Sequence, residues 1–290
     1  MNAVLHELVA RGPVVTDGAW GTELQARGLD SGEFPDLWNL THPDRVREVA
    51  RAYVEAGSQV ILTNTFGANR LRLRETAPGN RVADLNRAGV EISRAAAAGR
   101  AKVFASIGPS GKMLMTGETT EDELRVAFEE QAIALAAAGA DALVIETMAD
   151  LAEAAIAVRA AKSTGLPVVA CMVFDSGRQK DRTMMGATPE QAAAALAGAG
   201  TDVIGANCGQ GIAGFHVICQ RLKAATQLPI WIKANAGLPQ MVDGRPRYTT
   251  PPEEFAGHVP ELLRHGASFI GGCCGTNPAF IKAVGAVISK

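Results

Sequence analysis

The stretch AGADALVIETM, residues 138–148, contains the pattern that decides the fold class of this chain. An Ala-Gly pair, where a helix is expected to end, is followed after two residues by an apolar run that leads into a carboxylate. The segment 120–139 begins with Thr and ends at Gly, as capped helices do. Because the same four-residue turn recurs at 56–59 and 199–202, it predicts repeated junctions between a helix and the next strand.

Seven further apolar runs resemble the one at 142–148. Most are continuously apolar, which is typical of parallel strands covered on both faces. The eight expected strands are 13–19, 59–65, 102–108, 142–148, 167–174, 202–208, 229–237 and 269–275. Alanine-rich helical stretches lie between them, for example at 41–57, 120–139, 150–165 and 188–200.

Eight strand–helix units without a long linker predict an α/β chain with one domain over 1–290, a (β/α)8 TIM barrel. A doubly wound open sheet is the alternative. The barrel predicts that functional residues lie at the carboxyl ends of the strands and in the loops that follow. We expect the loop-rich segments at 20–40, 66–80, 109–119 and 238–252 to cover the barrel mouth.

The composition excludes several classes of protein. The net charge is −2 with both signs well mixed, so no basic stripe for nucleic acid is present. No apolar run approaches the roughly 20 residues of a membrane span, and the first residues lack the form of a signal peptide. We therefore expect a cytoplasmic enzyme without a nucleic-acid or membrane partner. The sequence leaves the oligomeric state open.

The five cysteines are an odd number, which argues against a disulfide framework. Cys208 ends the expected sixth strand, and Cys273 and Cys274 end the eighth, within GGCCGTNP at 271–278. All three are thus expected at the same mouth. Cys171 lies mid-strand and Cys219 lies in a helical stretch, so both are predicted to pack in the core.

Adjacent residues on a regular strand point to opposite faces. Cys273 and Cys274 can therefore converge only where the strand has ended or bent, and the flanking glycines allow such a backbone. Three thiolates with one open position match a catalytic zinc site, with a redox-active cysteine pair as the alternative. The open position suits another thiol, because coordination removes the thiol proton near neutral pH.

Polar residues mark the other strand ends. Asp17 and Glu146 are expected to receive an ammonium group, and the backbone at Gly18 and Ala19 is expected to receive a carboxylate. An amino acid that bears a thiol would satisfy all these features. Helix capping or a salt bridge is the alternative for the two carboxylates. Further polar residues at strand ends are Thr65 and Asn235.

Three other features predict no site of their own. GQGIAG at 209–214 fits the dinucleotide fingerprint, but the acidic residue expected about 20 positions later is absent. We interpret these glycines as a turn that lets Cys208 reach the metal. The five histidines are scattered along the chain and predict no ligand set, and Lys233 at a strand end has no evident activating partner.

At this point the chain resembles the zinc-dependent homocysteine S-methyltransferases. This family includes betaine–homocysteine methyltransferase and the homocysteine-binding domain of cobalamin-dependent methionine synthase. The matching stretches run in order along almost the whole chain: DGAWGT (17–22), TNTFGAN (63–69), IET (145–147), GANCGQG (205–211), NAGLP (235–239) and GGCCGTNP (271–278). The resemblance implies a (β/α)8 barrel, Zn²⁺ on Cys208, Cys273 and Cys274, homocysteine bound through its sulfur, and methionine as product.

The resemblance also implies substrate contacts. Asp17 and Glu146 match the family's positions for the substrate amino group, and the backbone at Gly18 and Ala19 matches its carboxylate site. The family's methyl donors are betaine, S-methylmethionine, S-adenosylmethionine, or a methyl-corrinoid protein charged from methyltetrahydrofolate.

We expect a small onium donor such as betaine. The alternatives are a separate corrinoid protein as methyl source, as in methionine synthase, and a non-catalytic zinc- or thiol-binding barrel. A betaine donor needs an aromatic cage for its quaternary ammonium. The candidates, for which loop packing is the alternative, are Trp20, Phe34, Trp38 and Phe66.

Overall fold

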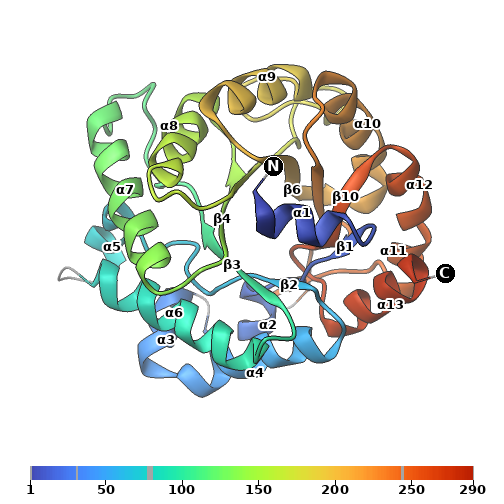
Figure 1. Cartoon of the computed structure of the whole chain (residues 1–290), viewed down its shortest axis with the longest axis horizontal. Helices are drawn as coiled ribbons and strands as arrows, with labels where there is room; N and C mark the ends of the chain where they lie inside the picture. Colours follow the sequence, from blue (N-terminus) through green and yellow to red (C-terminus); the bar gives the residue numbers. More distant parts are fainter. Residues whose placement is uncertain (1, 31, 77–80, 243–244, 290) are drawn as a thin grey trace.

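The computed structural model describes residues 2–30, 32–76, 81–242 and 245–289. Eight parallel strands form one sheet in the order β1-β10-β7-β6-β5-β4-β3-β2, and helices surround it (Figure 1). The predicted (β/α)8 TIM barrel is confirmed, and the open-sheet alternative is wrong. The strands are β1 (Val14–Val15), β2 (Val60–Ile61), β3 (Lys102–Ile107), β4 (Ala142–Met148), β5 (Val168–Met172), β6 (Val203–Gly211), β7 (Ile230–Asn235) and β10 (Ala267–Gly272).

Hydrogen bonds between β1 and β2, the first and last strands in sheet order, bring the sheet close to closure. The Gln59 amide donates to the Val15 carbonyl at 2.8 Å, and the Gln59 side chain accepts from the Val15 amide at 2.9 Å. Beyond them the Asp17 carboxylate accepts from the Leu62 amide at 2.7 Å. Here side chains make hydrogen bonds that backbone groups would make in a regular strand pair, which explains why β1 and β2 are much shorter than the expected strands.

The predicted junctions between helices and strands are confirmed. Gly57, Gly139 and Gly200 have φ values of +98°, +91° and +98°, a conformation that ends helices at little cost in glycine. The main outer helices are α4 (Pro43–Glu55), α6 (Val82–Ala97), α7 (Glu121–Ala137), α8 (Leu151–Lys162), α9 (Pro189–Ala199), α10 (Phe215–Ala225), α11 (Pro252–Gly257), α12 (Val259–Arg264) and α13 (Pro278–Ile288).

Helix α1 (Ala3–Val9) covers one end of the barrel, the end that faces the viewer in Figure 1. Its Leu5 and Leu8 are buried in the cluster that fills the barrel interior. Trp231 lies in the same cluster, and its ring centroid is 5.1 Å from that of Phe269. Because apolar side chains fill this end, we expect a ligand to enter at the opposite end, where the strands reach their carboxyl termini.

The connections at the mouth are more structured than expected. Segment 20–40 contains α2 (Gly21–Gln25), η1 (Pro35–Leu37) and the start of α3 (Trp38–Thr41). Segment 66–80 contains α5 (Arg70–Thr76), with 77–80 outside the described residues. Segment 238–252 contains the antiparallel strands β8 (Gln240–Val242) and β9 (Arg245–Arg247).

Candidate metal and substrate site

Three thiols converge at the mouth of the barrel. The Sγ atoms of Cys208, Cys273 and Cys274 all lie within 4.8 Å of one another, and the Cys208 and Cys274 sulfurs are 3.9 Å apart. Strand β10 ends at Gly272, so the two adjacent cysteines follow the strand and need not alternate. The expected convergence is confirmed. The other two cysteines are buried elsewhere, Cys171 in the barrel interior and Cys219 in the outer core.

The backbone around these thiols departs from regular strand geometry. Register between β6 and β7 shifts after Asn207, and Cys208 has a φ of +62°, a costly conformation for a residue other than glycine. Segment 209–214 is not a simple turn, because 209–211 continue β6 and 212–214 form η2 (Ile212–Gly214). In the final motif, Gly275 has a positive φ, whereas Gly272 provides space: a Cβ there would lie 2.2 Å from the Thr276 hydroxyl.

The donor set fits a divalent thiophilic metal ion. Hydrogen bonds from Cys273 and Cys274 lower the pKa of Cys208 to about 3. The contact with Cys208 raises the pKa of Cys273, and it raises that of Cys274 to about 12. The cluster alone therefore carries roughly one negative charge at neutral pH, since like charges so close oppose one another. A bound dication would compensate the two further negative charges that arise when the other two thiols lose their protons. Soft thiolates select such metals.

Neighbouring amides and a phenol orient the thiols. The Asn207 side chain lies 3.9 Å from the Cys273 sulfur and donates to the Thr147 hydroxyl at 2.7 Å. Asn235 donates to Cys208, and Tyr248, just after β9, is hydrogen-bonded to Cys274. Such second contacts fix the direction of metal ligands.

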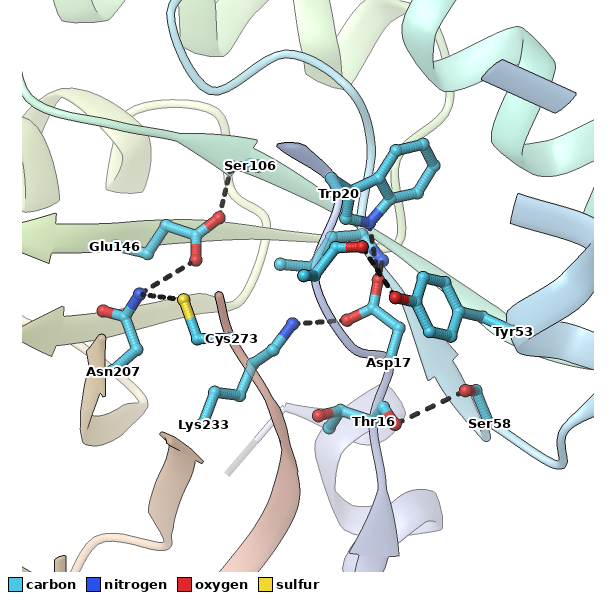
Figure 2. Close-up of polar contacts among 12 residues, drawn as sticks. Thr16, Asp17, Trp20, Tyr53, Ser58, Ser106, Glu146, Asn207, Lys233 and Cys273 are labelled. Atoms are coloured by element: carbon cyan, nitrogen blue, oxygen red, sulfur yellow. Dashed lines mark hydrogen bonds and ion pairs between the residues drawn. The ribbon is translucent and has the colours of Figure 1, made fainter. Parts of the chain in front are cut away.

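A buried charge cluster lies beside the thiols (Figure 2). The Lys233 ammonium is paired with the Asp17 carboxylate, and their side chains are only 3% and 0% exposed. The second Asp17 oxygen accepts from the Trp20 indole and from the Leu62 amide, each at 2.7 Å. Lys233 thus has a partner that the sequence did not reveal. The expected ammonium site at Asp17 already contains an ammonium group of the protein, so its contact with substrate stays a prediction.

Glu146 is the carboxylate of this cluster that faces open space. It lines a cavity that also contains the three thiols. It accepts hydrogen bonds from the Ser106 hydroxyl at 2.5 Å and from the Asn207 side chain at 3.2 Å. Burial raises the pKa of Glu146 against the opposing effect of Lys233. Burial also lowers the pKa of Lys233, but Asp17 and Glu146 outweigh it, so the net shift is upward. The lysine therefore stays charged between the two carboxylates.

A cavity of about 540 Å³ joins the thiols, Glu146 and the loop after β1. Of the aromatic candidates, Trp20, Phe34 and Phe66 line it. Trp38 is buried in the core, with its ring 4.6 Å from that of His42, and is not among the described residues that line the cavity. Gly18 and Ala19 line it, although the Ala19 amide already donates to the Thr276 hydroxyl at 3.1 Å.

Two further expected residues lie behind the cavity wall. The Thr65 hydroxyl donates to the Ser106 carbonyl at 2.7 Å and is fully buried. Asn235 is likewise buried, and its Oδ1 has no hydrogen-bond partner among the described residues. Sequence analysis placed both at strand ends correctly, but their side chains support the wall and do not line the cavity.

The family model for homocysteine S-methyltransferase matches residues 14–288. The chain belongs to this family. A homocysteine S-methyltransferase is an enzyme, and homocysteine is the substrate of the family. The resemblance noted from the motifs is thereby confirmed.

Two curated relatives of this chain are the methionine synthases of Mycobacterium tuberculosis (strain ATCC 25618 / H37Rv) and Mycobacterium leprae (strain TN). Each is 32% identical over 305 residues, which cover 99% of the chain. The chain spans about a quarter of the length of these relatives.

Among solved structures, the chain is similar to the metallated form of the homocysteine methyltransferase MmuM from Escherichia coli. The identity is 25% and the TM-score is 0.81, with 97% of this chain and 99% of the other covered. The apo form of the same protein gives 24% identity and a TM-score of 0.76. A metallated relative and a cluster of three thiols together indicate a metal site in this chain.

Several residues of the site were missed by sequence analysis. Lys233, Asn207 and Ser106 bind the predicted residues, yet Lys233 and Ser106 lie in apolar strands outside the matching motifs, and Asn207 lies within GANCGQG without a role that the motif reveals. Only the lysine could have been recognised from the sequence, because a charge within a strand covered on both faces must find a buried partner.

Among the described residues, no helix is long and apolar enough to cross a membrane.

Three of the five histidines, although scattered along the sequence, lie together between α10 and α12 in the fold. His216 Nε2 is 2.8 Å from His258 Nδ1, and His265 is in edge contact with His216.

Proposed function

We propose that this methyltransferase transfers a methyl group from a small onium donor to the sulfur of homocysteine, giving methionine, with Zn²⁺ held by Cys208, Cys273 and Cys274. The observation that carries the proposal is the convergence of three thiols within 4.8 Å on a cavity of about 540 Å³. When bound, zinc would supply a deprotonated substrate thiol at neutral pH. Three protein ligands with an open position are the catalytic arrangement for zinc.

The chain's own residues orient the substrate. Glu146 lines the cavity, whereas the Asp17 carboxylate is already paired with Lys233, so the Glu146 carboxylate is the available acceptor for the amino group of homocysteine. The loop at Gly18 and Ala19 borders the same cavity and is our candidate for its carboxylate. This pose leaves the substrate sulfur at the thiol cluster, where the methyl group must arrive.

Replacing Glu146 by glutamine is expected to weaken homocysteine binding about ten- to a hundredfold, since a charge-assisted contact contributes roughly 1.5–3 kcal/mol. Titration calorimetry measures this. Glu153→Gln is the matched control: Glu153 is also buried and accepts from the Ser110 amide at 2.7 Å, but it lines a different cavity. Equal losses in the two variants would count against the pose.

Aromatic side chains support an onium donor. Trp20, Phe34 and Phe66 line the cavity, and a cation over such rings gains about 0.5–2 kcal/mol. The indole of Trp20 is held by its hydrogen bond to Asp17, so the ring is oriented before a ligand binds. A donor methyl placed about 3–3.5 Å from the acceptor sulfur would then be in reach of direct transfer.

A second candidate is transfer from a methylated corrinoid protein. It is favoured by the 32% identity to two methionine synthases, of which the chain spans only a quarter. In this case the cavity would open toward a partner protein that delivers the methyl group.

A donor panel separates the two candidates. Purified protein with zinc and homocysteine is mixed with betaine, S-methylmethionine or S-adenosylmethionine, and methionine is measured. We expect turnover with at least one of these small donors. Turnover only after a methylated corrinoid protein is added would replace the first candidate by the second, and no methionine under either condition would refute both.

A further inference from the structure

A second group of metal-ligating side chains lies on the outer surface of the barrel. His216 is in the first turn of α10, Glu261 is in α12, and His258 and His265 flank α12 at its two ends. Helix α10 follows β6, the strand of Cys208, and α12 precedes β10, the strand that leads to Cys273. The group therefore bridges two helices that are connected in the chain to the strands of the thiol cluster. It does not contact the thiols themselves.

The distances within this group suit a single cation. One potential ligand atom each from His216, Glu261 and His265 lies within 4.8 Å of the other two. The Glu261 carboxylate is 3.9 Å from His216 Nε2 and 3.5 Å from His265 Nε2. Atoms bound to one zinc-sized ion at about 2.0–2.1 Å are little more than 3 Å apart, so a small inward movement of the exposed Glu261 would close the set.

The chemistry of the group also favours a metal over a charged histidine cluster. Burial lowers the pKa of His216, and His258, His265 and Arg264 lower it further against the opposing effect of Glu261. Imidazoles bind metals in their neutral form. Two imidazoles and a carboxylate form a ligand set that zinc uses in proteins.

We propose that His216, Glu261 and His265 form a second metal site, for a divalent late first-row cation such as Zn²⁺, Ni²⁺ or Co²⁺. His258, 2.8 Å from the same His216 nitrogen, is placed to join as a fourth ligand after a small shift. Imidazole and carboxylate ligands suit these cations, whereas the mouth of the barrel offers thiolates. A cation here would cross-link α10 and α12, between which Cys219 packs against the Leu262 and His265 carbonyls.

Cobalt(II) distinguishes the two sites in the intact protein. Cobalt bound by thiolates has sulfur-to-metal charge-transfer absorption, and cobalt bound by imidazole and carboxylate does not. Equilibrium dialysis counts total cobalt, and absorption reports the thiolate site. We expect wild type to bind a second cobalt equivalent that adds no charge-transfer absorption and raises the melting temperature.

His216→Ala, His265→Ala and Glu261→Gln are each expected to weaken the binding of the second cobalt ion by at least about ten- to a hundredfold. Removing even an indirect partner of a metal ligand produces a loss of this size. The charge-transfer band should stay as in wild type. His6→Ala is the matched control, because His6 is exposed on α1 at the far end of the barrel and should retain both equivalents. The half-exposed Glu261 is the variant least able to disturb folding.

The outcomes separate this site from the proposed zinc site. Wild type that binds cobalt only with charge-transfer absorption would overturn the second site, and so would a second equivalent that survives in all three variants. Loss of the charge-transfer band with the second equivalent retained would instead contradict the thiolate site and leave this proposal supported.

Discussion

Lys233→Met is expected to destabilise the protein by about 3–5 kcal/mol, one of the largest losses that a single substitution can produce here. The variant leaves the Asp17 carboxylate, fully buried, without its cation. It also removes the positive charge that offsets Glu146. Urea unfolding of the metal-free protein measures the change, so that loss of metal does not contribute to it.

The double variant Asp17→Asn with Lys233→Met tests the reason for this loss. Removing both charges eliminates the unpaired buried carboxylate, so the double variant should be more stable than Lys233→Met alone. The matched control is Lys162→Met, which removes the lysine of a half-exposed pair with Asp202 at 2.8 Å. Partly exposed pairs contribute about 0–1 kcal/mol. A loss in Lys233→Met as small as in this control would contradict the prediction.

The Asp17–Lys233 pair also bears on the proposed binding of homocysteine. Asp17 accepts from Lys233, from Trp20 and from the Leu62 amide, so it links β7, the aromatic wall and the near-closed seam of the barrel. A carboxylate that already accepts from three donors holds those groups in place, but it is a weak candidate to bind a further ammonium group. We therefore propose that Glu146 makes the direct contact with the amino group and that Asp17 acts through the position of Lys233 and Trp20.

Features carried by short stretches of the sequence could be predicted. The junction glycines Gly57 and Gly139 have the backbone conformation that their place after a helix indicated. The convergence of Cys208 with Cys273 and Cys274 followed from the barrel rule alone, because parallel strands end at one edge. In each case a residue type and its place in one strand–helix unit were sufficient.

Features that depend on distant side chains could not be predicted. Lys233 and Asp17 are 216 positions apart and meet because β7 and β1 lie on either side of β10 in the sheet. His216 and His258 lie 42 positions apart and meet because α10 packs beside α12, which no local pattern reports. Trp38 lies within the segment 20–40 that was expected to cover the barrel mouth, yet it packs inward. The sequence does not indicate whether a hydrophobic residue in a loop packs against the core or faces the cavity.

Cys208→Ser is expected to reduce bound zinc from about one per chain to a small fraction, with loss of methyl transfer. Thiolate zinc sites bind with roughly 10–16 kcal/mol at neutral pH, so removing one of a few ligands should weaken binding more than about a hundredfold. A serine hydroxyl is nearly isosteric but does not ionise near neutral pH. Metal analysis after gel filtration measures the loss, and Cys273→Ser and Cys274→Ser should behave alike.

The two remaining cysteines provide matched controls within the same chain. Cys171 lies in the barrel interior and Cys219 between α10 and α12, and both are fully or almost fully buried. Burial raises the pKa of the Cys171 thiol and brings that of Cys219 to about 12, so neither is a thiolate at neutral pH. Cys171→Ser and Cys219→Ser should therefore lose some stability but keep their zinc. Because all five variants make the same chemical change, full retention of zinc in Cys208→Ser would place the metal elsewhere.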